Sequence, residues 1–276
     1  MSNARDNLKS KKRIVVKIGS SSLVHEETGR LNIMRIERLV RVLVDLKNEG
    51  RDVCLVSSGA IAVGKASIGM YGEKDHGTDT LPVKQACASI GQAKLVMMYQ
   101  KLFAEYNTGM GQVLLTRVTL DNEYTSRNAY NTFEELFKLG VVPVVNENDS
   151  ISTEEIEQVQ TFGDNDRLSA IVAKLTGADL LVLLSDIDGM YTDDPKENPE
   201  AELISEITDI SEKLASMAKG THEGGPGTGG MSAKLAAAEI ALGAGADMLI
   251  LNGNDPGNIK LAMDGENVGT LFVHKS

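Results

Sequence analysis

Short apolar runs alternate with stretches of helical periodicity along this chain, and this alternation constrains the fold more than any other feature. The apolar runs lie at residues 13–18, 52–56, 112–115, 141–145, 180–184, 247–251 and 270–273. Helical patterns lie at residues 32–48, 81–106, 122–139, 167–175, 208–219 and 235–242, of which 81–106 is one long helix or a pair broken at Gly91. Strands that alternate with helices form parallel sheets, because right-handed crossovers carry the helices over both faces. The sequence therefore predicts an α/β fold with a mainly parallel sheet.

The composition is that of a globular protein from a reducing compartment. Of the 276 residues, 42% are hydrophobic and 24% are charged, which is ordinary for such a protein. We expect one domain over 13–276, preceded by an extended or disordered tail at 1–12. The apolar runs are shorter than the roughly 18 residues that a membrane span needs. The N-terminus has no signal-peptide core and both cysteines lie in apolar segments, so we expect a cytoplasmic protein with no membrane partner.

The net charge also limits the partners. A formal charge of −11 argues against a nucleic acid, because such binding depends on Lys and Arg neutralising phosphates. An anionic ligand must therefore meet positive groups gathered locally.

Two polar clusters follow the apolar run 141–145. The first is Asn-Glu-Asn-Asp at 146–149 and the second is Gly-Asp-Asn-Asp at 163–166. Ligands of open α/β sheets collect beyond the carboxyl ends of the strands. The segment 151–162 is long enough for a small hairpin that would bring the clusters together. The candidate site residues here are Asp149, Asn165 and Asp166.

A structural interpretation of these clusters stays open. Asn and Asp are frequent in turns and at helix N-caps, and Asp164 is placed to cap the helix that follows. Two such clusters within one strand-to-helix connection nevertheless favour a site.

Three further connections suit an anion. Lys17 lies near the end of the first run beside a Gly/Ser loop, and Ser58-Gly59 forms a small-residue turn before a helix. A glycine-rich loop at 224–230 enters a helix close to Lys234, which suits polyphosphate. The alternatives are an edge lysine, an N-cap at Ser58 and a flexible linker. Gly225, Gly227 and Gly230 match G-x-G-x-x-G, but they follow a helix, so a dinucleotide fingerprint is not expected.

The segment after the run 180–184 suits a nucleotide. It offers a hydroxyl and a carboxylate at Ser185 and Asp186, and Tyr191 is flat enough to lie near a base. An ordinary loop would have an acceptable composition as well.

One phosphate-loop match is rejected. Residues 59–66 resemble a P-loop with Lys65 at the lysine position, but Ala66 lacks the hydroxyl that ligates magnesium. The interior of the match is also apolar and helix-like.

Six segments together resemble the amino acid kinase family. They are VVKIGS (15–20), VSSGAIA (56–62), NEND (146–149), GDND (163–166), SDIDGMYTDDP (185–195) and GTGGMSAK (227–234). The resemblance extends from about residue 13 to the end of the chain. It implies a three-layer αβα sandwich, with glutamate toward the N-terminal half and ATP toward the C-terminal half. GDND with TGGM points to the member that phosphorylates the γ-carboxylate of L-glutamate in the first step of proline synthesis.

The resemblance also assigns residues to roles. Lys17 and Lys234 match the lysines that neutralise the transferring phosphoryl group, and Asp166 matches the aspartate that orients them. The positions that match the glutamate site are Ser58, Gly59, Asp149 and Asn165. The positions that match the ATP site are Lys17, Ser185, Asp186, Thr228, Gly229, Gly230, Met231, Ser232, Ala233 and Lys234.

The resemblance implies ATP with Mg²⁺ as co-substrate, although no protein ligand of the ion is identified. It further implies a homo-oligomer, proline as feedback inhibitor and hand-over to glutamyl phosphate reductase. Many relatives carry a C-terminal PUA domain, and we expect this chain to lack one. The alternatives are a relative acting on acetylglutamate or aspartate, and an inactive amino-acid-sensing module.

Overall fold

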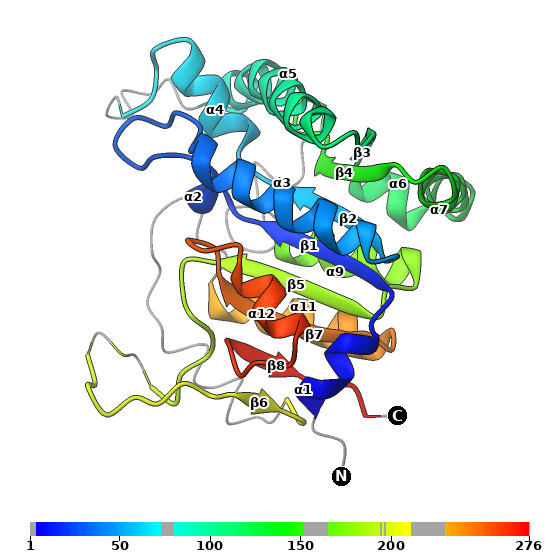
Figure 1. Ribbon diagram of the computed structural model, residues 1–276. Coiled ribbons are helices and arrows are strands. Elements are labelled where there is room, and N and C mark those ends of the chain that lie inside the picture. The colour runs from blue at the N-terminus through cyan, green and yellow to red at the C-terminus, as the bar shows by residue number, and fades with distance from the viewer. Residues whose placement is uncertain are drawn as a thin grey trace.

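The computed structural model describes residues 4–72, 80–151, 165–193, 195, 197–210 and 230–275. Its centre is an eight-stranded sheet in the order β3-β4-β2-β1-β5-β7-β8-β6 (Figure 1). The strands are β1 (Arg13–Ile18), β2 (Asp52–Ser57), β3 (Met110–Leu115), β4 (Val142–Glu147), β5 (Leu180–Ser185), β6 (Glu206–Ile207), β7 (Asp247–Asn252) and β8 (Thr270–Phe272). Neighbours from β3 to β7 pair in parallel, while β8 is antiparallel to β7. The predicted mainly parallel sheet is confirmed.

Helices cover both faces of this sheet. They are α1 (Ala4–Asn7), the 3₁₀ turn η1 (Leu8–Ser10), α2 (Ser20–Leu23), α3 (Ile33–Asn48), α4 (Ala60–Ser67), α5 (Leu81–Glu105), α6 (Arg117–Asp121), α7 (Glu123–Lys138), α9 (Asn165–Thr176), α11 (Met231–Gly243) and α12 (Asn258–Met263). The core on one face includes side chains of α3, α5 and α12, and the core on the other face includes side chains of α7, α9 and α11. The three-layer sandwich is therefore confirmed.

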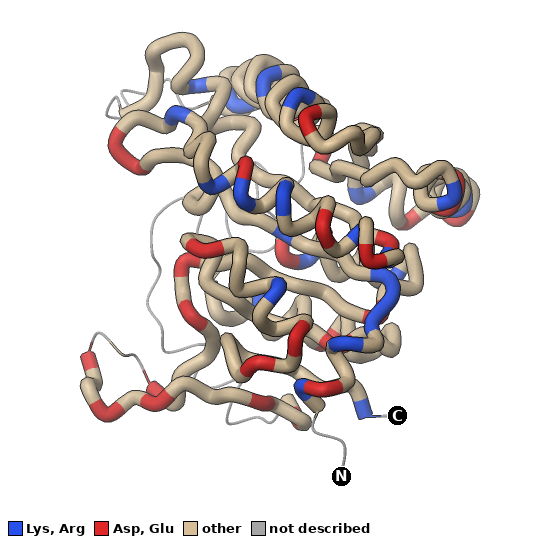
Figure 2. The backbone as a smooth tube through the Cα atoms, in the orientation of Figure 1, with Lys and Arg blue, Asp and Glu red and all other residues tan. Residues whose placement is uncertain are grey.

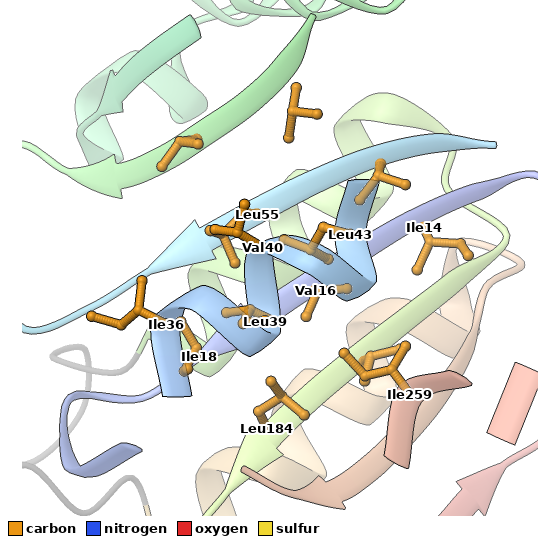
Figure 3. Close-up of a cluster of buried hydrophobic side chains, with 14 of the residues drawn as sticks. Ile14, Val16, Ile18, Ile36, Leu39, Val40, Leu43, Leu55, Leu184 and Ile259 are labelled. Carbon is orange, nitrogen blue, oxygen red and sulfur yellow. The ribbon is translucent and has the colours of Figure 1, made fainter. Parts of the chain in front are cut away.

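Strand β1 shows how the alternation of side chains places the site. Ile14, Val16 and Ile18 pack with α3 in the first core (Figure 3), whereas Val15 belongs to the second core. Successive side chains of a strand point to opposite faces. Lys17 therefore shares the face of Val15, where α9 and α11 lie.

Two expected helices begin one residue later than predicted, because their first residue is the N-cap. The side chain of Asn32 accepts a hydrogen bond from the backbone N–H of Arg35 at 3.1 Å. Asn122 accepts from the backbone N–H groups of Tyr124 and Thr125. These bonds satisfy amide groups that have no partner within the helix.

Helix α5 is continuous through Gly91, so of the two alternatives the single long helix is correct and the break at Gly91 is not. A Cβ at Gly91 would lie 1.8 Å from the carbonyl oxygen of Ala60, and one at Gly64 would lie 1.9 Å from that of Cys87. Both glycines therefore permit a close crossing of α4 and α5. The P-loop-like segment accordingly contains a packing glycine, and Lys65 lies within helix α4.

The N-terminal region differs from the expected extended or disordered tail. Residues 4–10 are helical, and the buried guanidinium of Arg5 donates to the carbonyl oxygens of Ser205 (2.5 Å), Val268 (2.6 Å) and Gly269 (2.9 Å). Five N–H groups allow an arginine to satisfy several carbonyls at once. This contact could not be predicted from the polar, basic sequence of the N-terminus, because the acceptors are backbone carbonyl groups far away in the chain.

Strand β6 and helix α12 were not predicted, since each is short. The hairpin expected at 151–162 and the helix expected at 208–219 lie largely outside the described residues.

Candidate active site

The carboxyl ends of β1, β2, β4, β5 and β7 meet at one edge of the sheet, because these strands are parallel. The connections that follow them pack together there. The backbone N–H of Gly253 donates to the carbonyl oxygen of Ser185 at 2.6 Å, and a Cβ at Gly253 would lie 2.6 Å from Oγ of Ser22. The segments after β1, β5 and β7 therefore form one continuous edge.

A buried group of three charges lies at this edge. Nζ of Lys17, on β1, is 2.5 Å from Oδ1 of Asp166, and Nζ of Lys234, on α11, is 3.3 Å from Oδ2 of the same carboxylate. Asp166 is in the first turn of α9 and is 1% exposed, and both lysines are buried. Three elements distant in the sequence thus converge on one carboxylate.

The electrostatics of this group favour an anionic ligand. Burial alone would raise the pKa of the Asp166 carboxyl, but the ammonium groups of Lys17 and Lys234 outweigh it and hold the pKa below its ordinary value. Asp166 is therefore ionised at neutral pH. Two ammonium groups and one carboxylate carry a net positive charge in a region shielded from water, where such a charge acts strongly on a phosphoryl group.

A chain of amides and a hydroxyl adjoins the three charges. Nδ2 of Asn165 donates to Oγ of Ser58 at 2.6 Å and to Oδ1 of Asn146 at 3.4 Å. Nδ2 of Asn146 donates in turn to Oε1 of Gln92, on α5, at 2.8 Å. Asn165 immediately precedes Asp166, so this polar chain and the charged group share one helix start.

The turn after β2 needs a glycine. Gly59 has φ of 91°, in the left-handed region, and it precedes the first residue of α4. The backbone N–H of Ser58 donates to the carbonyl oxygen of Ile18 at 3.2 Å, which ties this turn to the end of β1. The turn therefore lies next to Lys17.

Asp149 lies in the turn that follows β4. Burial removes water from its carboxylate and raises the pKa of the Asp149 carboxyl to about 6. Such a carboxylate is readily stabilised by an incoming cation.

The segments expected to bind a nucleotide lie at the same edge. Oγ of Ser185 donates to Oδ1 of Asp186 at 3.0 Å. Asp188 accepts from Nδ2 of Asn252 at 2.7 Å and from the hydroxyl of Tyr191 at 3.2 Å. Gly230 is the N-cap of α11, whose first residues are Met231, Ser232, Ala233 and Lys234. Thr228 and Gly229 lie outside the described residues.

Acidic residues recur along the described part of the segment that leads from β5 to β6 (Figure 2). They include Asp193, Glu197, Glu200 and Glu202. Such a surface repels a phosphate backbone. In the part of the chain that the structure describes, no helix is long and apolar enough to cross a membrane.

The structure thus brings five of the predicted site residues into one connected arrangement. They are Lys17, Ser58, Asn165, Asp166 and Lys234. Sequence reasoning assigned no role to Asn146 or Gln92. Asn146 opens the polar cluster at 146–149, whereas Gln92 is one of several polar residues within a long helix and belongs to no motif.

Comparison with known proteins identifies the family of this chain. Residues 12–252 match the model of the amino acid kinase family. The chain is 46% identical over 271 residues to a glutamate 5-kinase of Clostridium perfringens, covering 98% of each chain. It is 50% identical over 271 residues to a glutamate 5-kinase of Carboxydothermus hydrogenoformans, covering 98% of this chain and 70% of that one.

Solved structures with the same fold are more distant in sequence. The UMP kinase of Bacillus anthracis aligns with a TM-score of 0.64 at 17% identity, covering 96% of this chain and 97% of that one. The isopentenyl phosphate kinase of T. acidophilum aligns with a TM-score of 0.61 at 19% identity, covering 95% of this chain and all of that one. With a family match over most of its length and relatives of 46–50% identity, this chain belongs to the amino acid kinase family.

Proposed function

We propose that this protein is a glutamate 5-kinase, which transfers the γ-phosphoryl group of ATP to the γ-carboxylate of L-glutamate. One observation carries the proposal: the buried Lys17–Asp166–Lys234 group adjoins the Asn165–Ser58 polar chain, so a phosphoryl site and a substrate site share the start of α9. The glutamate 5-kinases that are 46–50% identical to this chain support the choice of substrate.

The geometry suits phosphoryl transfer without a general base. The γ-carboxylate of glutamate has an ordinary pKa near 4.3 and is ionised at neutral pH, so it can attack directly. Phosphoryl transfer asks the protein mainly for positioning and for stabilisation of charge on the equatorial oxygens. Lys17 and Lys234 supply that charge, and Asp166 holds both ammonium groups in place.

The proposed sites divide within one amino acid kinase domain over 13–276. Ser58, Gly59, Asp149 and Asn165 hold glutamate toward the N-terminal half, with Asp149 facing the α-ammonium. ATP lies toward the C-terminal half along residues 185–186 and 228–234, with its γ-phosphate between Lys17 and Lys234.

The ATP enters as its magnesium complex. Among the described residues, no three His, Cys, Asp or Glu side chains form a group that would hold a metal ion. Phosphate oxygens and water are the usual ligands of magnesium in such complexes, and they would supply most of the coordination here.

The product has consequences for partners. An acyl phosphate is a reactive anhydride, so hand-over to a reductase that consumes it fits the chemistry. Proline resembles the backbone of glutamate, which makes it a suitable feedback inhibitor of the same site.

We expect a glutamate-dependent hydroxamate when the protein is incubated with ATP, magnesium, L-glutamate and hydroxylamine, because hydroxylamine traps an acyl phosphate. N-acetylglutamate should give none, since Asp149 is proposed to recognise a free α-ammonium. The colorimetric iron assay for hydroxamates measures both. Equal rates with the acetylated substrate, or turnover of aspartate in place of glutamate, would assign the protein to another carboxylate. No turnover with any of the three would make it a binding module.

We also expect kcat/KM for glutamate to fall as the pH is lowered from about 7.5 to about 5, because kcat/KM reports ionisation of the free enzyme. The Asp149 carboxyl has a pKa of about 6, so it becomes protonated over this range and loses its attraction for the α-ammonium. Below this pKa the fall should approach about tenfold per pH unit. Steady-state kinetics at saturating magnesium ATP measure it.

The matched control is Asp149→Asn. This variant should show a higher KM for glutamate and a kcat/KM that does not vary over the same pH range. Comparison with this variant also separates the ionisation of Asp149 from that of the nucleotide. If the variant keeps the pH dependence of the wild type, Asp149 is not the titrating group.

A further inference from the structure

Helix α5 contributes a polar side chain to the substrate site although it carries none of the expected site residues. Oε1 of Gln92 accepts the hydrogen bond from Nδ2 of Asn146 at 2.8 Å. Asn146 is 2% exposed, and Gln92 is half-buried. Gln92 is therefore the far end of the chain of hydrogen bonds that reaches Ser58 through Asn146 and Asn165.

We propose that Gln92 is a positioning residue, which acts through Asn146 to fix the direction of each hydrogen bond between Gln92 and Ser58. It thereby presents the Ser58 hydroxyl as a donor to the substrate carboxylate. This inference rests on the proposed function, because the acceptor of the Ser58 hydroxyl is taken to be a carboxylate of the proposed substrate.

The direction follows from the inventory of donors and acceptors. An amide side chain has one acceptor oxygen and one NH₂ group with two donors. Since the NH₂ of Asn146 faces Gln92, its Oδ1 faces Asn165 and accepts at 3.4 Å. The NH₂ of Asn165 then also donates to Oγ of Ser58 at 2.6 Å. Because Oγ already accepts, the hydrogen of this hydroxyl is free to point to another acceptor.

If the oxygen and the NH₂ group of the Gln92 side chain exchanged places, every hydrogen bond between Gln92 and Ser58 would change direction. Its NH₂ would then face Asn146, whose oxygen would turn toward Gln92 and whose NH₂ would turn toward Asn165. Asn165 would in turn present its oxygen to Ser58, and the hydroxyl would have to donate to it. Only lone pairs of the Ser58 oxygen would then remain for the substrate, and they repel a carboxylate. The observed direction is thus the one that binds an anion.

Helix α5 is well placed to hold Gln92 still. The adjacent Gly91 lies in the close crossing with α4, where a Cβ would be 1.8 Å from the carbonyl oxygen of Ala60. Seven residues beyond Gln92, the buried hydroxyl of Tyr99 lies 2.9 Å from Oγ of Ser57, at the end of β2. Residues supported by rigid elements position a site more accurately than residues on loops.

The test replaces Gln92 with methionine, which has similar volume and helix propensity but cannot accept this hydrogen bond. Gln92→Met should raise the KM for L-glutamate roughly tenfold, which corresponds to about 1.4 kcal/mol. The KM for ATP and kcat should each change less than about threefold, since only the amide chain is altered. Gln100→Met, at an exposed position of the same helix, is the matched control and should leave all constants unchanged.

A double-mutant cycle separates positioning from a general structural effect. In an Asn146→Ala background, or in Asn146→Ser should the alanine variant not fold, Gln92→Met should raise the KM less than about twofold further. Thermal unfolding establishes that each variant is folded. An additive effect, or an unchanged KM in Gln92→Met, overturns the inference while the proposed function stands. If the wild type forms no hydroxamate from L-glutamate, the proposed function fails and this inference fails with it.

Discussion

Replacing Asp166 with asparagine is expected to lower kcat roughly 10²- to 10³-fold, because removing one preorganised electrostatic element typically costs about 3–4 kcal/mol of transition-state stabilisation. The carboxylate lies 2.5 Å from Nζ of Lys17 and 3.3 Å from Nζ of Lys234. Asparagine keeps the shape but has no charge, and its NH₂ meets an ammonium group as donor against donor. Both lysines would lose their fixed positions, at the point where charge develops during transfer.

The KM values for ATP and glutamate should change only a few-fold in Asp166→Asn, since Asp166 itself is proposed to contact neither substrate and most of the proposed contacts with ATP and glutamate are made by residues other than Lys17 and Lys234. Coupled detection of ADP gives kcat and both KM values. Removing one partner of a buried ion pair also costs about 3–5 kcal/mol of stability, so thermal unfolding and ATP binding by calorimetry accompany the kinetics. A variant that is folded, binds ATP and differs only in KM would contradict the assigned role.

Truncating either lysine should be at least as damaging. Lys234→Ala removes a buried positive charge from the proposed transfer site, so we expect kcat to fall by at least about 10³-fold. Lys17→Ala should behave in the same way because the two ammonium groups share one carboxylate. The same coupled assay measures both variants.

Lys65→Ala is the internal control for these variants. Lys65 follows Gly64 in the segment that resembles a P-loop, yet it lies in helix α4. The kcat of Lys65→Ala should stay within a few-fold of that of the wild type. If Lys65→Ala proves as damaging as Lys234→Ala, the phosphate site is wrongly placed.

Several features of this protein follow from local sequence patterns. The apolar runs became strands, and Asn32 and Asn122 became N-caps, because periodicity and side-chain capping act within a few residues. The candidate residues Lys17, Asp166 and Lys234 were identified by motif resemblance.

The close approach of these residues to one another does not follow from local sequence patterns. Asp166 and Lys234 are 68 residues apart, and they meet because α9 and α11 pack on the face of the sheet to which Lys17 points. The contacts of Arg5 with distant carbonyls and the crossing at Gly91 were likewise invisible in the sequence. The hydrogen bond between Gln92 and Asn146 could not be predicted either, because the two residues are 54 positions apart.

The physical reason is the range of the interactions. The sequence by itself determined the periodicity of each strand and helix, the turn chemistry and the residue types available for catalysis, because these depend on neighbours in the chain. Strand order, helix crossings and the direction of the Gln92–Asn146–Asn165–Ser58 chain were decided only by the tertiary structure. These features depend on which surfaces pack together, and buried polar groups find their partners only after that packing is established.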